Sequence, residues 1–441
     1  MHSKDLRNEV DGISRDISSL QARLNEKQAQ LDALTYPVLS LPPEITSEIF
    51  IHCLPTWWSG VDAKVAPLLF LQICRRWREI VISTPALWTS LNLDVAVRKA
   101  HVADISRTWL ERSRNRPFYV RFAGSIADID DFVGFAENFA RHAQRFNFMV
   151  LELSERDFQQ LDVYHPEFSS LCKLVLRMET REQDEAPQGP FEMFSSAPLL
   201  EAVTLHGIPP ALVALPWGQL KSFIGDLMRL SDCMEVLRLM PNLTTCTFSI
   251  FENADPHDTV VLSHPSMSLF VLRHGFQSSD DQEEACSLEI LQFVHFPNLR
   301  VLRLEGVKDY ETPALDSFIE RGQLWMISKA FEQGRLSHLD LWYPSDGIVR
   351  IFLEQLASDE DFVPGLERLS VHCRKYRHFM GKIEPEVLLV IAAAPIARRR
   401  RLLGTTEFKS FLVFSQMPVK LKKEGMDIHI NGLQEGLKLL K

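Results

Sequence analysis

The sequence predicts an α/β protein in three parts: an N-terminal helix at residues 3–35, a small all-α unit at 37–93, and an irregular α/β solenoid with a parallel, concave sheet at 98–430. Three observations carry this prediction. Apolar residues recur every three or four positions near the N-terminus, short helical segments follow between prolines, and a strand-like unit then repeats along the chain. The length of 441 residues, about three times a typical domain of ~150, fits such a modular chain.

The first part is predicted to be a coiled-coil helix. Its apolar residues recur in alternating steps of three and four, and most other positions are polar. Lys27 is the one charged residue at a position where this spacing expects an apolar residue. Such a helix has nothing of its own to bury its apolar seam against, so it needs a second helix. Two interpretations stay open, a homodimer formed by two parallel copies and a helix folded back on the rest of the chain. The seam consists of Leu6, Val10, Ile13, Ile17, Leu20, Leu24, Leu31 and Leu34.

Two short helices are predicted between Pro37 and Trp88. The first follows a proline-rich turn, places its apolar residues on one face and ends at Pro55. The second runs through "APLLFLQICRRWREIVIS" as one continuous helix, and Pro85 stops it. About 50 residues in short helices give a small core, so this unit is expected to expose apolar surface that a partner covers.

The segment contains a Leu-Pro pair followed by Glu44 and an Ile-rich helix, and later a Cys-Arg-x-Trp sequence and a Leu-Trp pair. In this pattern it resembles an F-box, in particular that of fungal proteins with a short coiled coil directly before the box. The resemblance implies docking on the Skp-type adaptor of a cullin-RING ubiquitin ligase, and through the adaptor on cullin. The alternative is a helical hairpin packed on the following domain, with Trp77 and Trp88 as ordinary core residues. Arg75 also matches the pattern. The residues expected to bind the adaptor are Leu41, Pro42, Glu44, Ile45, Ile49, Phe50, Leu54, Leu71, Cys74, Trp77, Leu87 and Trp88.

The third part repeats the pattern apolar-x-x-apolar-x-apolar, as in "LCKLVL", "LRVLRL" and "LSHLDL". Segments with helical periodicity lie between several copies, so strands and helices alternate and a leucine-rich-repeat-like solenoid is predicted. The alternative is an ordinary α/β domain whose strands look alike. The copies begin at Phe148, Leu171, Leu200, Leu220, Leu243, Met267, Leu299, Leu336, Leu366 and Phe408.

Within each predicted strand the apolar residues point inward and the intervening residues face solvent on the concave side. The later copies place charged and aromatic residues at these outward positions, and Arg and Trp dominate binding hot spots. A solvated sheet face is the alternative for each residue. The residues expected to bind a target protein are Arg273, Arg303, Asp340, Trp342 and His372.

Signals for chemistry are scarce. No phosphate-binding glycine loop, nucleophile elbow or zinc-protease motif occurs, so we expect no enzyme, cofactor or metal site. The net charge of −10 disfavours nucleic acid as a partner. Seven scattered cysteines with no C-x-x-C spacing indicate free thiols, and no membrane-spanning or secretory segment is apparent.

These features predict a protein of the cytoplasm, the nucleus or both. Arg398 to Arg401 are either a nuclear import patch or a basic helix end. The resemblance implies the substrate-recognition subunit of an SCF-type ubiquitin ligase, in which the box binds the adaptor and the repeats bind a target. The alternative is a non-degradative interaction scaffold with the same box.

Overall fold

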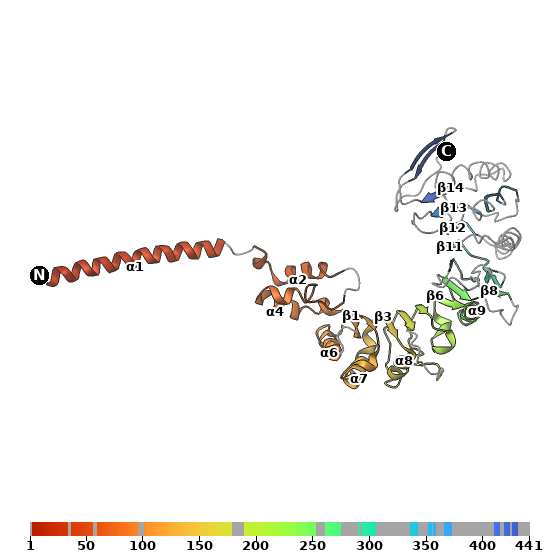
Figure 1. Cartoon of the computed structure of the whole chain (residues 1–441), viewed down its shortest axis with the longest axis horizontal. Coiled ribbons are helices and arrows are strands. Elements are labelled where there is room, and N and C mark those ends of the chain that lie inside the picture. The colour runs from red at the N-terminus through yellow and green to blue at the C-terminus, as the bar shows by residue number, and fades with distance from the viewer. Residues whose placement is uncertain are drawn as a thin grey trace. The chain divides into compact units, whose positions relative to one another are not determined.

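The computed structural model is shown in Figure 1, and its chain divides into two compact units. The first comprises Met1–Asn92 and Arg107–Arg116, and the second comprises Leu93–Ser106 and Pro117–Lys441. The structure describes residues 2–33, 37–55, 60–95, 101–178, 189–252, 261–274, 290–291, 293–305, 336–342, 352–354, 356–358, 366–372, 410–414, 419–423 and 426–430.

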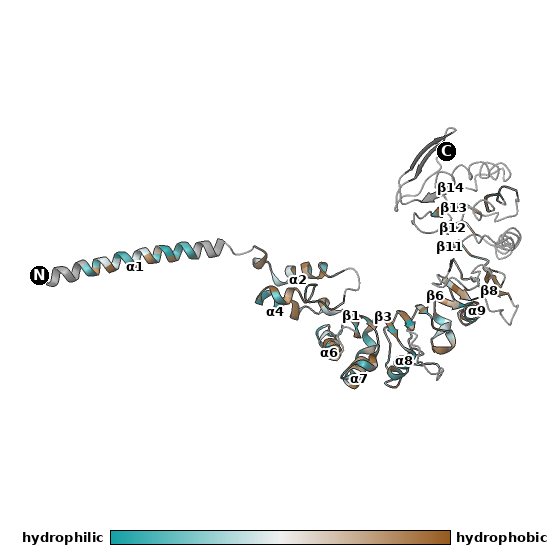
Figure 2. Ribbon diagram, in the orientation of Figure 1, coloured by the Kyte–Doolittle hydropathy of each residue, from teal (hydrophilic) through white to brown (hydrophobic). Residues whose placement is uncertain are grey.

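A single helix, α1 (His2–Ala33), forms the N-terminal part of the chain, as predicted. Hydrophobic positions recur along this otherwise hydrophilic helix (Figure 2). The side chains of Val10, Ile13, Ile17, Leu20 and Leu24 are 50–67% exposed. The apolar seam therefore faces solvent in the single chain, and the coiled coil stays a prediction.

A helical unit follows, in which prolines and a cysteine set the helix boundaries. Pro43 is the first residue of its helix, where a missing N–H costs nothing, and Pro85 begins a short 3-10 turn after Thr84. The elements are η1 (Pro37–Ser40), α2 (Pro43–His52), α3 (Phe70–Ile73), α4 (Arg75–Ser83) and η2 (Pro85–Trp88).

The prediction of one continuous second helix is wrong at Cys74. This residue is extended, with φ −155° and ψ 167°, so it separates α3 from α4. Its Sγ accepts a hydrogen bond from the backbone N–H of Trp77 at 3.5 Å and thus caps α4. An extended residue interrupts the i to i−4 hydrogen-bond ladder, and a capping side chain compensates by satisfying one of the freed N–H groups.

The core of the helical unit is aromatic. Phe50 from α2 stacks on Phe70 from α3 with ring centroids 4.2 Å apart, and its ring lies edge-on to Trp77 from α4 at 4.8 Å. Phe50 is 2% exposed. Three short helices are thus held together by one aromatic cluster, an arrangement whose ring geometry adds to the free energy of area burial.

A second cluster surrounds Trp88, which is fully buried. The indole Nε1 of Trp88 donates to the carbonyl oxygen of Val81 at 2.9 Å, the ring of Trp109 lies edge-on at 4.9 Å, and the guanidinium of Arg112 lies 4.3 Å from the ring centroid. Trp109 and Arg112 belong to α6 (Val102–Arg112). The sequence assigned residues 98–430 to the solenoid, but residues 107–116 pack with the first unit because they cover Trp88.

Twelve strands of the described chain form one sheet, in the order β1-β2-β3-β4-β5-β6-β7-β9-β11-β12-β13-β14. Every neighbouring pair from β2 to β14 is parallel, so eleven strands follow one another in sequence order, as in a solenoid of stacked repeats. This confirms the predicted α/β class and parallel sheet.

The strands of this sheet are β1 (Ser90–Asp94), β2 (Phe118–Ala123), β3 (Phe146–Leu153), β4 (Lys173–Met178), β5 (Ala202–His206), β6 (Ser222–Arg229), β7 (Thr245–Glu252), β9 (Leu269–His274), β11 (Val301–Glu305), β12 (His338–Trp342), β13 (Arg368–His372) and β14 (Ser410–Phe414). Two further pairs lie outside it. These are the parallel pair β8 (Leu262–Ser263) with β10 (Val294–His295), and the antiparallel pair β15 (Val419–Lys423) with β16 (Met426–Ile430).

The predicted alternation of inward and outward residues is confirmed in four strands, whereas Val271 of β9 and Ser370 of β13, at positions predicted to face outward, are 4% and 3% exposed. In β11, Leu302 and Leu304 are at most 3% exposed, whereas Arg303 and Glu305 between and after them are half-buried. The same alternation of apolar interior and more accessible outward positions holds in β4, β5 and β12. The outward rows run across neighbouring strands, which places residues far apart in sequence side by side.

Helices between the strands begin at strong capping residues. A side-chain oxygen of Asp131 accepts from the N–H of Gly134 at the start of α7 (Phe132–His142), and Ser154 and Asp157 form a reciprocal capping box at α8 (Glu155–Asp162). The predicted helical periodicity around Leu237 is confirmed by α9 (Leu230–Leu239), which packs against β6 and β7.

Strand β2 was not predicted. Its apolar residues Phe118, Val120 and Phe122 alternate and are buried, but they lack the leading apolar residue three positions earlier that marks the other repeats. The repeat pattern therefore does not include β2, although the alternation of apolar residues alone predicts a strand there.

Candidate functional site

The helical unit carries uncovered apolar side chains on two helices. Ile45 and Ile49, one turn apart on α2, are 51% and 43% exposed. Leu69 and Ile73, one turn apart at α3, are 39% and 52% exposed. Since residues four apart share a helix face, each pair forms a short apolar strip over the aromatic core. We call these four residues the apolar surface.

Hydrogen bonds fix the segment that leads into this surface. The guanidinium Nη2 of Arg76 donates to the carbonyl oxygen of Leu41 at 2.9 Å, and the hydroxyl of Thr46 donates to the carbonyl oxygen of Pro42 at 3.1 Å. Arg78 Nε likewise donates to the carbonyl oxygen of Leu71 at 2.8 Å. Arg76 and Arg78 thereby tie Leu41, before α2, and Leu71, within α3, to α4, so hydrogen bonds connect the helices that carry the apolar surface.

The twelve residues predicted to contact an adaptor fall into three groups. Pro42, Glu44, Ile45 and Ile49 are exposed. Phe50, Leu87 and Trp88 are at most 2% exposed, so their assignment to a contact surface is corrected: they form the core beneath it. The half-buried group consists of Leu41, Leu54, Leu71, Cys74 and Trp77. The pattern pointed to apolar residues at fixed spacing but did not distinguish those that face out from those that pack within.

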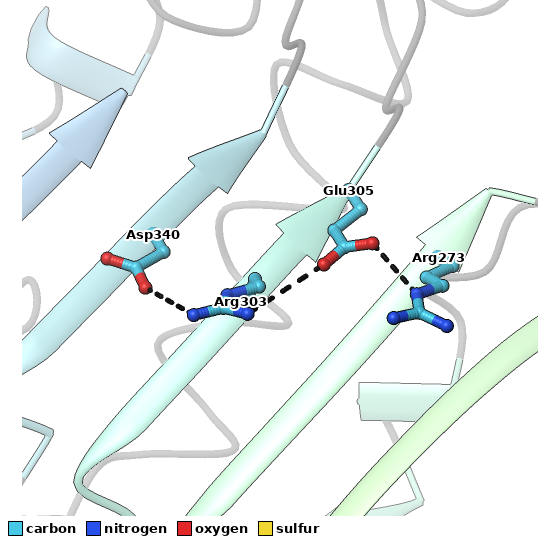
Figure 3. A network of polar contacts seen from close by, with 4 residues as sticks. All are labelled: Arg273, Arg303, Glu305 and Asp340. Atoms are coloured by element: carbon cyan, nitrogen blue, oxygen red, sulfur yellow. Dashed lines mark hydrogen bonds and ion pairs between the residues drawn. The ribbon is translucent and has the colours of Figure 1, made fainter. Parts of the chain in front are cut away.

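On the sheet, four charged residues from three neighbouring strands form a continuous chain of ion pairs (Figure 3). Arg273 Nε lies 2.8 Å from Glu305 Oε2, the other carboxylate oxygen of Glu305 lies 4.0 Å from Arg303 Nη1, and Arg303 Nη2 lies 3.3 Å from Asp340 Oδ2. We call these four residues the charge ladder. The strand register places Arg303 opposite Asp340, and Glu305 opposite Arg273.

The charge ladder is formally neutral, because two guanidinium groups face two carboxylates. Three of its members, Arg273, Arg303 and Asp340, were predicted as target contacts, and the structure pairs them with one another through Glu305. Outward positions of earlier strands hold a further ion pair, Arg121 with Glu152, and a hydrogen bond between His206 and Asp226. Cross-strand pairing of opposite charges stabilises a sheet modestly and leaves these side chains less available to attract a charged partner.

His372 lies in β13 beside the charge ladder, in the outward row that also contains Glu305 of β11. Burial lowers the pKa of His372 from 6.5 to about 4; Asp340 opposes this shift, and Arg303 adds to it. The imidazole is therefore neutral at neutral pH and can donate or accept a hydrogen bond without adding charge. Trp342 occupies the same row by register, between Glu305 and His372, but its side chain lies outside the described part.

Strand alternation predicted that Glu305, which links both arginines of the charge ladder, faces outward, but Glu305 was not among the predicted target contacts. Arg121 was missed with its strand β2, whose partner carboxylate on β3 would otherwise have suggested a cross-strand pair.

The described residues offer little reactive chemistry. They contain no group of three or more His, Cys, Asp or Glu residues that could hold a metal ion. Cys233 and Cys246 are buried, and burial raises the pKa of each thiol well above 9.0, which disfavours the reactive thiolate. Cys373 lies outside the described residues. No described helix is both long and apolar enough to cross a membrane.

A scan against protein-family models finds no match to this chain, and a search of curated proteins likewise finds none.

Proposed function

We propose that this protein is the substrate-recognition subunit of an SCF-type cullin-RING ubiquitin ligase. The helical unit would bind a Skp-type adaptor, and through it cullin, while the outward face of the parallel sheet would bind a target protein. Catalysis would belong to other subunits. The contribution of this chain would be proximity, because it raises the effective concentration of target lysines near the ubiquitin-charged enzyme. Such a role fits the cytoplasm or the nucleus.

One observation carries this proposal. Ile45, Ile49, Leu69 and Ile73 face solvent, although the unit has a packed aromatic core that could have sheltered apolar residues. Exposed apolar strips above a small, well-packed core are typical of a surface that a protein partner covers. The resemblance of the same residues to an F-box supplies the kind of partner.

Binding of a purified Skp-type adaptor to the full chain tests the first half of the proposal. Replacing Leu41 and Pro42 together by alanine should abolish co-purification, because it removes two of the proposed contacts, and so should serine at Ile45 and Ile49, because it removes half of the apolar surface. Val133→Ser, at a 57% exposed position on α7, is the matched control and should leave adaptor binding unchanged. Adaptor bound equally by the wild type and both double variants would contradict the proposal.

The rival function is a non-degradative scaffold, in which the same box tethers the adaptor without delivering a substrate. Immunoprecipitation of the full chain followed by mass spectrometry separates the two. Adaptor together with cullin supports the ligase subunit, adaptor without cullin supports the scaffold, and neither protein would count against both.

Recovery of further proteins in the same experiment tests the receptor face. The triple replacement of Arg303, Asp340 and Trp342 by alanine should reduce capture of a target while adaptor binding persists, because the adaptor surface lies in the other unit. Equal recovery of every captured protein by the wild type and the triple variant would exclude this part of the sheet as the receptor face.

A further inference from the structure

A second uncovered set of apolar side chains lies on α1, outside α2 and α3. Val10, Ile13, Ile17, Leu20 and Leu24 alternate steps of three and four along one stripe, and each is at least half exposed in the single chain. Covering such a stripe with another helix lowers the free energy, because it removes apolar surface from water. The charged residues that flank the stripe indicate which helix that is.

A parallel pair of copies places identical positions at the same height. Lys27, which occupies a seam position, would then meet Lys27 of the second copy, bringing two ammonium groups together in an apolar interface. At the flanking positions, Asp16 would face Gln21 and Arg23 would face Gln28 of the second copy, so no opposite charges would pair. The parallel arrangement thus has a repulsive layer and gains nothing at its flanks.

In an antiparallel pair with Ile17 opposite Leu20 of the second copy, flanking residues of opposite charge face each other. Asp16 then faces Arg23 of the second copy, and the two-fold symmetry repeats this pair. Lys27 no longer meets its own copy, but lies opposite Val10 and next to Glu9. Flanking charges set partner and orientation in coiled coils, so these matches favour one arrangement.

We propose that two copies of this protein associate through antiparallel α1 helices in this register. Because each residue advances the helix by 1.5 Å, the C-terminal ends of the two α1 helices would lie about 44 Å apart. The remainder of each chain would leave from opposite ends of the helix pair. A parallel pair would instead bring both helical units together. The proposal stands or falls separately from the function proposed above.

Sedimentation of the full chain over a range of concentrations tests self-association. We expect the wild type to form dimers, and the variant with Ile17→Asp and Leu20→Asp to remain monomeric because it places unpaired charge in the seam. A wild type that is monomeric at every concentration up to about 100 micromolar would overturn the proposal, since a dimer with a larger dissociation constant would be of little consequence.

Charge exchange tests the orientation. Arg23→Asp should weaken the dimer roughly tenfold, because it turns both Asp16–Arg23 pairs into like-charge contacts, and Asp16→Arg should act similarly. The double variant with both changes restores opposite charges and should regain most of the wild-type affinity. Arg15→Asp makes the same charge change away from the seam and should have little effect.

Failure of the double variant to recover, with both single variants weakened, would overturn the antiparallel register. In a parallel pair these two residues do not face each other, and no rescue is expected there. Equal effects of Arg15→Asp and Arg23→Asp would also contradict the proposal, because they would show a loss of helix stability rather than a specific contact.

Discussion

In the helical unit apolar side chains such as Ile45 and Ile49 face solvent, whereas on the sheet the outward side chains of Arg273, Glu305 and Arg303 are charged and bind one another. The difference follows from geometry. Parallel strands lie about 4.8 Å apart and bring outward residues of successive repeats into contact, so opposite charges can pair within the chain. Short helices have no such neighbour, and their outer strips stay uncovered.

This contrast has a consequence for recognition. An uncovered apolar strip favours association by burial and is sensitive to shape, while a neutral ladder of paired charges offers hydrogen-bonding groups at fixed positions with little net field. A target of the sheet would therefore be selected by the arrangement of polar groups rather than by its overall charge.

The largest effect is expected for Phe50→Ala. Phe50 stacks on Phe70 and lies edge-on to Trp77, so its loss opens a cavity among three helices and should lower the free energy of unfolding of the helical unit by about 3–5 kcal/mol. Hydrogen exchange of the α2 and α4 amides measures the loss locally. Ile49→Ala, one residue earlier and 43% exposed, should change the same amides far less. Similar effects of the two variants would erase the distinction between core and apolar surface.

Leu302→Ala should have the next largest effect, in the second unit. Leu302 is fully buried in β11, and truncation of a buried leucine costs about 2–5 kcal/mol. Denaturant unfolding of the full chain, followed by hydrogen exchange in β9, β11 and β12, measures it. The matched control is Leu199→Ala, the same substitution at a 54% exposed position. A comparable loss of stability in the control would show that the inward position of Leu302 is not the reason for its effect.

Leu302 and Phe50 also show which buried residues could be predicted from the sequence and which could not. Leu302 and its neighbours were predictable because a repeated unit fixes which side chains face inward, and burial then follows from strand alternation. Phe50 was predicted as a partner contact because the resemblance to an F-box includes it together with Ile45 and Ile49 on one helix face. Only the positions of α3 and α4 decide which of these side chains is covered, and those depend on the break at Cys74.

The candidate site on the sheet was predictable in part. Strand alternation placed Arg303 and Asp340 on the outward face correctly, but their pairing depends on which strands are neighbours and in what register. A sequence with repeats separated by 20 to 42 residues does not reveal the register directly. The packing of Trp109 on Trp88 was likewise beyond reach, because it joins residues across a predicted domain boundary.

A pH-dependent loss of stability is expected from His372. Its pKa in the folded protein is about 4, below the usual 6.5, so the unfolded chain binds the proton more readily. The stabilisation by neutral His372 is complete above pH 6.5 and should be lost as pH falls from 6.5 to 4. With allowance for partial exposure, it amounts to roughly 1 kcal/mol. Denaturant unfolding at several pH values measures it, and His372→Gln should show a shallower loss over that interval. Identical slopes would rule out His372 as the source.

The smallest effect is expected from the charge ladder itself. Arg303→Ala leaves Asp340 and Glu305 without one partner, whereas Arg303→Ala with Asp340→Ala removes both ends of one pair and leaves Glu305 bound to Arg273. The double variant should therefore cost less than the two single changes added together. Because the Arg303 side chain is 32% exposed, the coupling free energy should stay below about 1 kcal/mol. Denaturant unfolding of the four proteins of the cycle measures it. A coupling of several kcal/mol would mean that the ladder supports the fold strongly, and strictly additive effects would mean that Arg303 and Asp340 contribute to stability independently of each other.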